Sequence, residues 1–390
     1  MTDLDARTTR EAGSRDTQPG MAAHTARHGG HQGRVPNTVK PGLASLLAAG
    51  LTLVLAGSAL ADWTGPEVIT DARIPGVADR NVALDGNGKA HTVYQPGTWH
   101  EDGRHWEWHI RVEYATNRGG TWRTTTLLPF QNGASYDTES IAVDTAGKVH
   151  VLVARRTSSG HKMVYVTNRS GSWVSSRLAA AIWSSAHLQV LNGKLHIAYS
   201  TGSGVFYRTN ASGRWVNTKI GTTGWVRDFA LDSRGKAHVA WERSEPSRLY
   251  YTTNRSGNWV RRTISEHPYD LGLRFAVDGD LKVHLAWTRA SSAIHIRYAT
   301  NRSGTWSASA RVAAGANVGL TVSGRGKVHI VSGDMVSRYQ HTTNRSGSWV
   351  TVPLSGDGHG NTPAVAVDAL GNAHAVLDAA GDGLIYTRET

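Results

Sequence analysis

The chain has 390 residues, a formal net charge of +12, 39% hydrophobic residues and no cysteine. The lack of cysteine excludes a disulfide framework, an iron–sulfur cluster, a thiolate zinc site and a cysteine nucleophile. The ratio of hydrophobic to charged residues excludes a disordered chain, and the length accommodates one large repeat fold or two ordinary domains.

The N-terminal 61 residues have the pattern of a leader. An apolar run at 43–56 is 14 residues long, which is short of the roughly 20 residues that a membrane-spanning helix needs. Ala59-Leu60-Ala61 follows it, with small residues at the positions that signal peptidase recognises. We therefore expect residues 1–61 to be a leader with a secretory signal peptide, ranked ahead of an uncleaved anchor. The mature chain, 62–390, would be secreted and extracellular, with no membrane segment.

A first motif occurs seven times along the mature chain. Each copy has apolar residues alternating with small or polar ones, a Gly-containing turn, and then Lys or Asn two residues before a His. Such a pattern predicts a hairpin of two half-buried strands, whose turn is started by Asp and completed by Gly. The shared histidines are His91, His150, His196, His238, His284, His329 and His374.

A second motif follows each of the first six copies and has an Asn, a tight turn and a Trp, as in YATNRGGTW at 114–122 and YTTNRSGNW at 251–259. Two hairpins make four strands in a unit of roughly 45 residues, which is the signature of a β-propeller blade. The arginines of these turns should form a solvated basic rim on one face. They are Arg118, Arg169, Arg255, Arg302 and Arg345.

The seventh unit ends at Thr390, where its Asn-turn-Trp motif should appear. Residues 62–70 of the mature N-terminus match the missing segment and contain Trp63. Pairing this strand with the C-terminal strand would close the ring and remove a free edge. The sequence thus predicts an all-β, seven-bladed β-propeller of four-stranded antiparallel blades, closed by the two chain ends in the last blade.

The Asn-turn-Trp motif resembles the Asp-box (BNR) repeat of sialidase-like propellers, in a relaxed form with Asn117 to Trp122 as its nearest copy. The resemblance covers nearly all of the mature chain and implies the fold more than the activity, because hydrolases, lyases and lectins share such turns. Sialidases have six blades and use an Arg triad, a Tyr/Glu pair and an Asp acid/base. By repeat register Arg80 takes the place of their first Arg, and Asp102 resembles their acid/base in its loop position.

Residues that repeat serve the scaffold, whereas a catalytic or binding group is needed once. We therefore expect the seven histidines to be structural, each satisfied between neighbouring strands. In a meandering blade the two repeated turns lie on one face, so the irregular connections gather on the opposite face, where propeller sites are found.

The largest irregular connection spans 95–110. It combines carboxylates with aromatic and basic residues, and indole faces stack on sugar rings while His, Arg and carboxylate groups hydrogen-bond hydroxyls. The connection either contacts a ligand or packs its own tryptophans against the blade. The candidate ligand-binding residues in it are Trp99, His100, His105, Trp106, Trp108 and His109.

Further single-copy polar residues lie just before the predicted inner strands. Arg80, Arg227 and Arg274 would bind a carboxylate bidentately if they converge at the central mouth. Glu139, His187 and Asp228 occupy similar positions, and His267, Tyr269 and Asp270 form a second candidate acid/base group. The competing interpretation of each is ordinary charge pairing at the rim.

Two functions stay open from the sequence. The leading hypothesis is a secreted, monomeric, lectin-like propeller whose partner is a carbohydrate or an acidic polysaccharide. The alternative is an enzyme, either a sialidase-like glycosidase or a polysaccharide lyase, with Arg80 and Asp102 as catalytic residues. We expect no cofactor, no metal and no nucleic-acid partner, since no nucleic-acid-binding motif occurs.

Overall fold

The computed structural model describes residues 62–71, 82–102, 105–181, 186–333, 338–357, 362–379 and 383–390, and all the regular elements in these ranges are β-strands. No helix in these ranges is long and apolar enough to cross a membrane. The expected signal peptide and Arg80 lie outside the described residues.

The strands form seven four-stranded antiparallel sheets, which we number as blades 1 to 7 by their inner strands. Blades 1 and 2 are β2 (Val82–Leu84), β3 (Ala90–Tyr94), β6 (Val112–Thr116) and β7 (Arg123–Leu128), then β8 (Ala134–Val143), β9 (Val149–Thr157), β10 (Gly160–Thr167) and β11 (Val174–Ala181). Blades 3 and 4 are β12 (Ala186–Leu191), β13 (Lys194–Thr201), β14 (Gly204–Thr209) and β15 (Val216–Gly221), then β16 (Trp225–Leu231), β17 (Ala237–Ser244), β18 (Ser247–Thr253) and β19 (Val260–Ser265).

The remaining blades follow the same meander. Blades 5 and 6 are β20 (Asp270–Val277), β21 (Val283–Ala290), β22 (Ile294–Thr300) and β23 (Ala310–Ala314), then β24 (Ala316–Val322), β25 (Val328–Gly333), β26 (Arg338–Thr343) and β27 (Val350–Asp357). Blade 7 is β28 (Ala364–Val367), β29 (Ala373–Asp378), β30 (Leu384–Arg388) and β1 (Glu67–Thr70), and β4 (Gly97–Asp102) pairs with β5 (His105–Ile110) in a separate hairpin.

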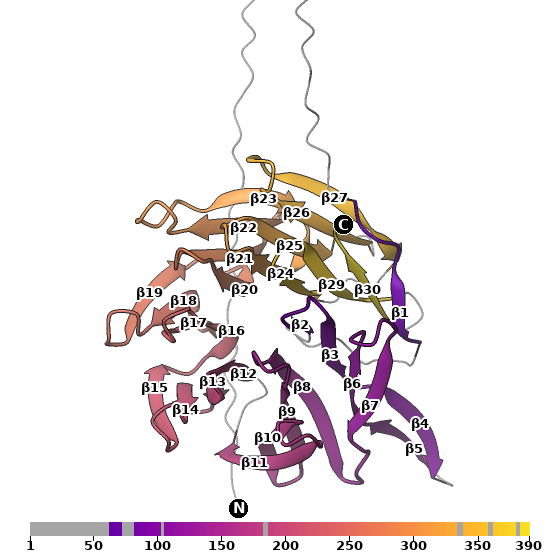
Figure 1. Cartoon of the computed structure of the whole chain (residues 1–390). Helices are drawn as coiled ribbons and strands as arrows, with labels where there is room; N and C mark the ends of the chain where they lie inside the picture. Colours follow the sequence, from indigo (N-terminus) through magenta and orange to yellow (C-terminus); the bar gives the residue numbers. More distant parts are fainter. Residues whose placement is uncertain are drawn as a thin grey trace, which may run out of the picture. The chain divides into compact units, whose positions relative to one another are not determined.

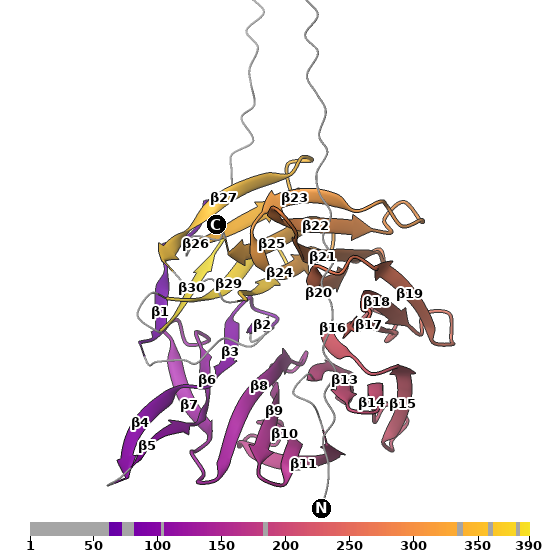
Figure 2. The ribbon, with the colours of Figure 1, turned by 180° about the vertical axis from the view of Figure 1, so that it is seen from behind.

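The blades are arranged as a closed ring. Each inner strand contacts the inner strand of the next blade, and β28 of blade 7 contacts β2 of blade 1. Figures 1 and 2 show β8, β12, β16 and β20 around the centre, with the later strands of each blade farther out. The predicted seven-bladed propeller is therefore confirmed.

The first and last strands of the propeller close the ring in blade 7, as the sequence predicts. β1 pairs antiparallel with β30, and Trp63 forms a β-bridge with Glu389. The Trp63 ring packs edge-on against His341 of blade 6, with ring centroids 5.0 Å apart. In the same way Trp122 of blade 1 packs on Tyr386 of blade 7, so Trp63 supplies the tryptophan that the C-terminal sequence lacks.

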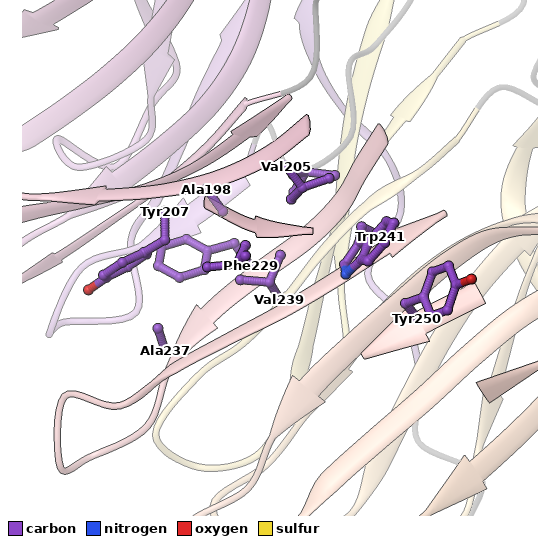
Figure 3. Packing of buried hydrophobic residues seen from close by; sticks show 10 residues of the cluster. Ala198, Val205, Tyr207, Phe229, Ala237, Val239, Trp241 and Tyr250 are labelled. Carbon is purple, nitrogen blue, oxygen red and sulfur yellow. The ribbon is translucent and has the colours of Figure 1, made fainter. Parts of the chain in front are cut away.

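The apolar core lies between neighbouring blades. Each of seven buried clusters is shared by two adjacent blades. Between blades 3 and 4, for example, Tyr207 of β14 lies against Phe229 of β16, and in the same cluster Trp241 of β17 stacks on Tyr250 of β18 (Figure 3). Because every blade depends on both neighbours for burial, closure of the ring stabilises the whole structure.

The repeated turns have the geometry that their residues predict. In blade 4, Asp232 Oδ1 accepts hydrogen bonds from the main-chain N–H groups of Arg234 and Lys236. In the second turn, Asn254 Oδ1 accepts from Ala237 N at 2.8 Å, and Gly257, with φ of +98°, donates to Asn254 O. The left-handed geometry at position 257 explains the glycine.

The arginines of the second motif have a role that their repetition alone did not reveal. Arg255 of blade 4 donates a 2.9 Å hydrogen bond to Leu281 O, in the first turn of blade 5. Arg169 reaches Gly193 O and Arg302 reaches Gly326 O of the following blade in the same way. These exposed side chains therefore connect successive blades as well as contributing positive charge to the solvated rim.

The repeated histidines are buried and hydrogen-bonded within their blades. His238 Nδ1 lies 2.5 Å from Tyr251 Oη, and its Nε2 faces Asp232 Oδ2 at 3.4 Å. Burial lowers the pKa of His238, although Asp232 acts in the opposite direction. Six of the seven histidines share this contact with a tyrosine hydroxyl, which fits the structural role expected for them.

Candidate functional site

Two faces of the propeller differ in regularity. The regular face carries the turns within the two repeated motifs, such as 85–89 and 117–122, and the irregular face carries the other connections within and between blades. The departures from the repeat that the structure describes on the irregular face are the β4–β5 hairpin, the connection at 129–133 and several ion-paired side chains. These features define the candidate site.

The connection at 95–110 is a regular hairpin rather than an irregular loop. In its register Trp99 pairs with Trp108, and Glu101 pairs with Trp106. Because side chains alternate between the two faces of a strand, these four positions share one face of the hairpin, and positions 100 and 109 belong to the other. The alternation of aromatic and polar residues around Asp102-Gly103 is the sequence signal that predicts such a hairpin.

An aromatic stack joins the hairpin to the connection between blades 1 and 2. The exposed His100 ring stacks on His109 at 4.5 Å between centroids, with an interplanar angle of 19°. His109 in turn stacks on Phe130, at 3.5 Å and 13°. Residues from β4, β5 and the connection 129–133 thus form a continuous column of rings.

A hollow of about 440 Å³ lies beside this column. Its lining includes Phe130 and Asn132 of the connection, Ser135 of β8, and Arg156 and Thr157 at the end of β9. The hollow therefore combines an aromatic ring with amide, hydroxyl and guanidinium groups. Sequence reasoning missed Phe130 and Arg156, because neither belongs to a motif.

The cationic groups next to the hollow are held in place by neighbours. Arg156 forms an ion pair with Asp137, and both side chains are partly exposed. Arg155 donates to Gln131 Oε1 at 2.8 Å. The guanidinium of Arg156 is therefore oriented by Asp137 and still reaches the hollow.

The central channel is a second hollow, of about 330 Å³, lined by inner strands of all seven blades. Most of its lining is aliphatic, as at Val82, Ile141 and Val322, with Ser140, Gln189 and Thr321 as polar exceptions. Among the described residues, no acidic, basic or cationic side chain lines the channel.

Three predicted ligand-binding residues lie within inner strands, where their side chains contact other protein groups. They are Glu139, Arg227 and Arg274. Glu139 in β8 accepts a 3.0 Å hydrogen bond from Ala186 N of blade 3. Arg227 in β16 is ion-paired with Glu242, and Arg274 in β20 donates to Leu273 O and, at 3.4 Å, to Arg227 O. Arg227 and Arg274 thus meet at the junction of blades 4 and 5, whereas Glu139 belongs to the junction of blades 2 and 3.

The second candidate acid/base group has one buried member and two more accessible ones. Arg289 donates two hydrogen bonds to Asp270, at 2.6 and 2.7 Å, and Ser265 donates a third. Burial acts to raise the pKa of Asp270, but these hydrogen bonds outweigh it and leave the pKa below its usual value. Asp270 is therefore a structural carboxylate, and Tyr269 is 56% exposed.

Several predicted site residues cannot be placed at the level of their side chains. Arg80 lies outside the described residues. The structure describes only the backbone of β4 and β5 at the other positions, which are Trp99, Asp102, His105, Trp106 and Trp108. Their roles stay predictions, and His100 and His109 are the members of the hairpin set that the structure brings together.

Comparisons with known proteins identify the fold. No family model matches the chain, and no curated protein matches it. Among solved structures, the chain is similar to a polysaccharide lyase of family PL25, an ulvan lyase bound to -[GlcA(1-4)Rha3S]-, with a TM-score of 0.55, 8% identity, and coverage of 83% of this chain and 95% of the lyase.

Two further structures are similar. Virginiamycin B lyase from Staphylococcus aureus aligns with a TM-score of 0.54 and 10% identity, over 84% of this chain and 100% of the lyase. The NanB sialidase from Streptococcus pneumoniae aligns with a TM-score of 0.45 and 11% identity, over 84% of this chain and 70% of the sialidase. At these identities the similarity shows the propeller fold alone.

Proposed function

We propose that this protein binds a carbohydrate on its irregular face, in the hollow lined by Phe130 and by the paired ends of β8 and β9. The observation that carries the proposal is the column of His100, His109 and Phe130 beside a hollow that Arg156 also lines. This arrangement occurs once in a ring built largely from repeated features.

The chemistry of the hollow suits a sugar. A saccharide ring has an apolar face of C–H groups, which stacks on an aromatic ring such as Phe130, and an edge of hydroxyls. Asn132, Ser135 and Thr157 supply hydrogen-bonding groups to that edge. The volume of about 440 Å³ lies within the range of about 300–1,000 Å³ that is usual for ligand pockets.

Charge favours an acidic saccharide over a neutral one. Asp137 engages Nε of Arg156, so a ligand carboxylate or sulfate would bind the two terminal amino groups of this planar guanidinium. Residues 1–61 carry six basic and four acidic residues, so the exported chain would keep 12 − 2 = +10 of formal net charge, which attracts polyanions at low ionic strength. An acidic polysaccharide is therefore the first class of ligand to test, and a saccharide-bound propeller among the structural neighbours points to the same choice.

Binding is favoured over turnover because four carboxylates on or near the irregular face are engaged by the scaffold. Asp137, Glu242 and Asp270 are each paired with an arginine. Glu139 accepts from the main chain of the next blade. A carboxyl group that acts as a general acid or base must meet the substrate and exchange a proton near neutral pH, whereas these four groups are committed to structural contacts.

The proposal is tested by a glycan array that includes uronate-containing and sulfated polysaccharides, followed by calorimetric titration of the best ligand. Phe130→Ala and Arg156→Gln should each weaken binding by about tenfold, which corresponds to about 1.4 kcal/mol. Tyr269→Ala removes an exposed aromatic ring from another blade and should leave affinity unchanged. Lack of saturable binding to any saccharide, or wild-type affinity in Phe130→Ala, would contradict the proposal.

The same ligands distinguish a binder from an enzyme. Incubation with fluorogenic sialosides and with uronate polysaccharides should release no product and form no unsaturated uronate. Turnover that Asp102→Asn abolishes would replace the binding proposal with the enzymatic alternative.

The proposal includes export from the cell. The basis is the apolar run at 43–56 followed by Ala59-Leu60-Ala61. N-terminal sequencing of the protein recovered outside its producing cell should begin at Asp62, and retention of the intact chain inside the cell would contradict export.

A further inference from the structure

Blade 6 departs from the histidine–tyrosine pair that the other blades share. Where Tyr251 or Tyr298 places a hydroxyl on the histidine of its blade, blade 6 has His341. His341 Nε2 lies 3.1 Å from His329 Nδ1, and the two imidazole rings are stacked with an interplanar angle of 11°. Blade 6 therefore has two imidazole rings in contact where the other blades have a histidine and a tyrosine.

Two more departures accompany this substitution. The first turn of blade 6 begins with Ser323, where five other blades place an aspartate beside the histidine. A carboxylate comes instead from blade 7, where Glu389 takes the position of the second-motif asparagine. Glu389 Oε2 accepts from Ala373 N at 2.8 Å, just as Asn344 Oδ1 accepts from Val328 N in blade 6.

Glu389 thereby completes a compact cluster. Its Oε2 lies 3.5 Å from His329 Nδ1, and its Oε1 lies 3.7 Å from His341 Nδ1. One ligand atom from each of the three residues falls within 4.8 Å of the others. Arg345 approaches Glu389 Oε2 at 3.5 Å from the solvent side, with its side chain 42% exposed.

The cluster is buried and incompletely satisfied. The side chains of His329, His341 and Glu389 are at most 1% exposed. His329 Nε2 and Glu389 Oε1 have no hydrogen-bond partner among the described residues. Burial lowers the pKa of both imidazoles. A buried carboxylate with an unpaired oxygen is costly unless a further group compensates it.

We propose that His329, His341 and Glu389 form a binding site for one transition-metal ion, with Zn²⁺ as the best match. Two imidazole nitrogens and one carboxylate oxygen are a common ligand set of zinc, which binds them at about 2.0–2.2 Å and accepts a fourth ligand such as water. Ca²⁺ and Mg²⁺ prefer oxygen ligands throughout and do not fit two histidines. This site lies on the regular face and is independent of the saccharide hollow.

The position of the site gives the ion a structural consequence. Glu389 belongs to the C-terminal end of blade 7, forms a β-bridge with Trp63, and meets both histidines of blade 6. A bound ion would therefore tie the strand that closes the ring to the preceding blade. Metal binding should stabilise the fold, because the ligands are brought together only in the folded chain.

The test measures Zn²⁺ binding to the full chain by calorimetric titration after chelator treatment, together with thermal unfolding. The leader contains His24, His28 and His31, so some zinc binding elsewhere is expected. The informative quantity is therefore the difference from His341→Tyr, which restores the hydroxyl that the other blades use and should fold. This variant should bind one equivalent less than the wild type. Zn²⁺ should raise the wild-type Tm by a few degrees and leave the variant's Tm unchanged.

Two further measurements separate a zinc site from a metal-free hydrogen-bonded cluster. Glu389→Gln keeps an acceptor for Ala373 N and removes the charged ligand, so it should weaken the same site at least tenfold. Co²⁺ should give a visible spectrum of a four-coordinate site with the wild type and lose it with His341→Tyr. Equal zinc stoichiometry in the wild type and His341→Tyr, or an unchanged wild-type Tm with Zn²⁺, would overturn the proposal.

Discussion

At the scale of single residues, the asparagine of the second motif shows how one side chain stabilises two strands. Asn254 Oδ1 accepts from Ala237 N, so the turn between β18 and β19 is fastened to the start of β17. The corresponding contact of Asn168 with Val149 N in blade 2 has the same length, 2.8 Å. The asparagine of this motif therefore has a structural role, because it joins the turn to a neighbouring strand by a hydrogen bond.

Asn254→Ala should lower the free energy of unfolding by about 1–3 kcal/mol, because the Ala237 N–H loses its acceptor in a partly buried position. Denaturant unfolding of the variant measures the change. Asn258→Ala, in the exposed part of the same turn, is the matched control and should change stability by less than about 0.5 kcal/mol. Equal effects of the two substitutions would show that the contact is not stabilising.

The buried histidines make stability depend on pH. Burial lowers the pKa of the histidine in six blades, namely His91, His150, His196, His238, His284 and His374. Their contribution is complete above the unfolded-state pKa of about 6.5. It declines as pH falls below that value toward the folded-state pKa, because the unfolded chain then binds more protons. The guanidinium concentration at the midpoint of unfolding should be lower at pH 5.5 than at pH 7.5. An equal or higher midpoint at pH 5.5 would refute the role given to the histidines.

Much of this residue-level structure is predictable from the repeats. Asp, Gly, Asn and Trp recur at fixed offsets, and each has a local conformational reason to be there. Glu389 is different, because it lies where the chain ends and where the sequence shows no copy of the motif. Its contacts with His329 and His341 come from a neighbouring blade, so nothing local in the sequence indicates them.

At the scale of elements, the arginines of the second motif connect each blade to the next through hydrogen bonds to main-chain oxygens. Arg255 connects blades 4 and 5 through Leu281 O, and Arg302 connects blades 5 and 6 through Gly326 O. Blade 3 has Ala211 in the corresponding place, so it lacks such a side chain. The sequence shows that the arginines repeat, but their partners lie in the next repeat and depend on how the blades are arranged in space.

Arg255→Ala should destabilise the protein by about 0.5–1.5 kcal/mol, as expected for the loss of one hydrogen bond with an exposed donor. Ala211→Arg would add the missing contact to blade 3. It should raise the free energy of unfolding by a similar or smaller amount. Chemical denaturation of both variants measures the two changes, and a loss of stability in Ala211→Arg together with no change in Arg255→Ala would contradict the role given to these arginines.

The β4–β5 hairpin marks the limit of sequence reasoning about the candidate site. The concentration of aromatic residues at 95–110 identified an unusual connection, which was expected to be irregular and is in fact a paired hairpin. The stack of His109 on Phe130 was not predictable, because the two residues belong to different connections. Arg156 likewise joins the hollow only because β9 ends beside residues 132–135.

At the scale of the whole molecule, the ring depends on closure by its ends. β1 covers the outer edge of β30, and Trp63 fills the place against blade 6 that a motif tryptophan fills elsewhere. The prediction of this closure rested on the missing motif in the last unit, and the structure confirms it. The topology explains why the propeller can keep its first and last strands together without disulfides.

Trp63→Ala should lower the free energy of unfolding by about 2–4 kcal/mol, because a large, partly buried ring is removed from the closing junction. Trp122→Ala, at the equivalent contact with Tyr386, should have a similar effect. Trp215→Ala, in a more exposed place, should have a smaller one. Unfolding in the presence of a chelator measures all three, and a negligible effect of Trp63→Ala would show that the ring does not need this closure.

The central claim is that a saccharide binds where the ring departs from its repeat on the irregular face. A crystal structure of the protein soaked with the tightest-binding saccharide from the array tests it most directly. The account predicts sugar density against the Phe130 ring, within hydrogen-bonding distance of Arg156. Density in the central channel or on the regular face, with this hollow empty, would contradict it.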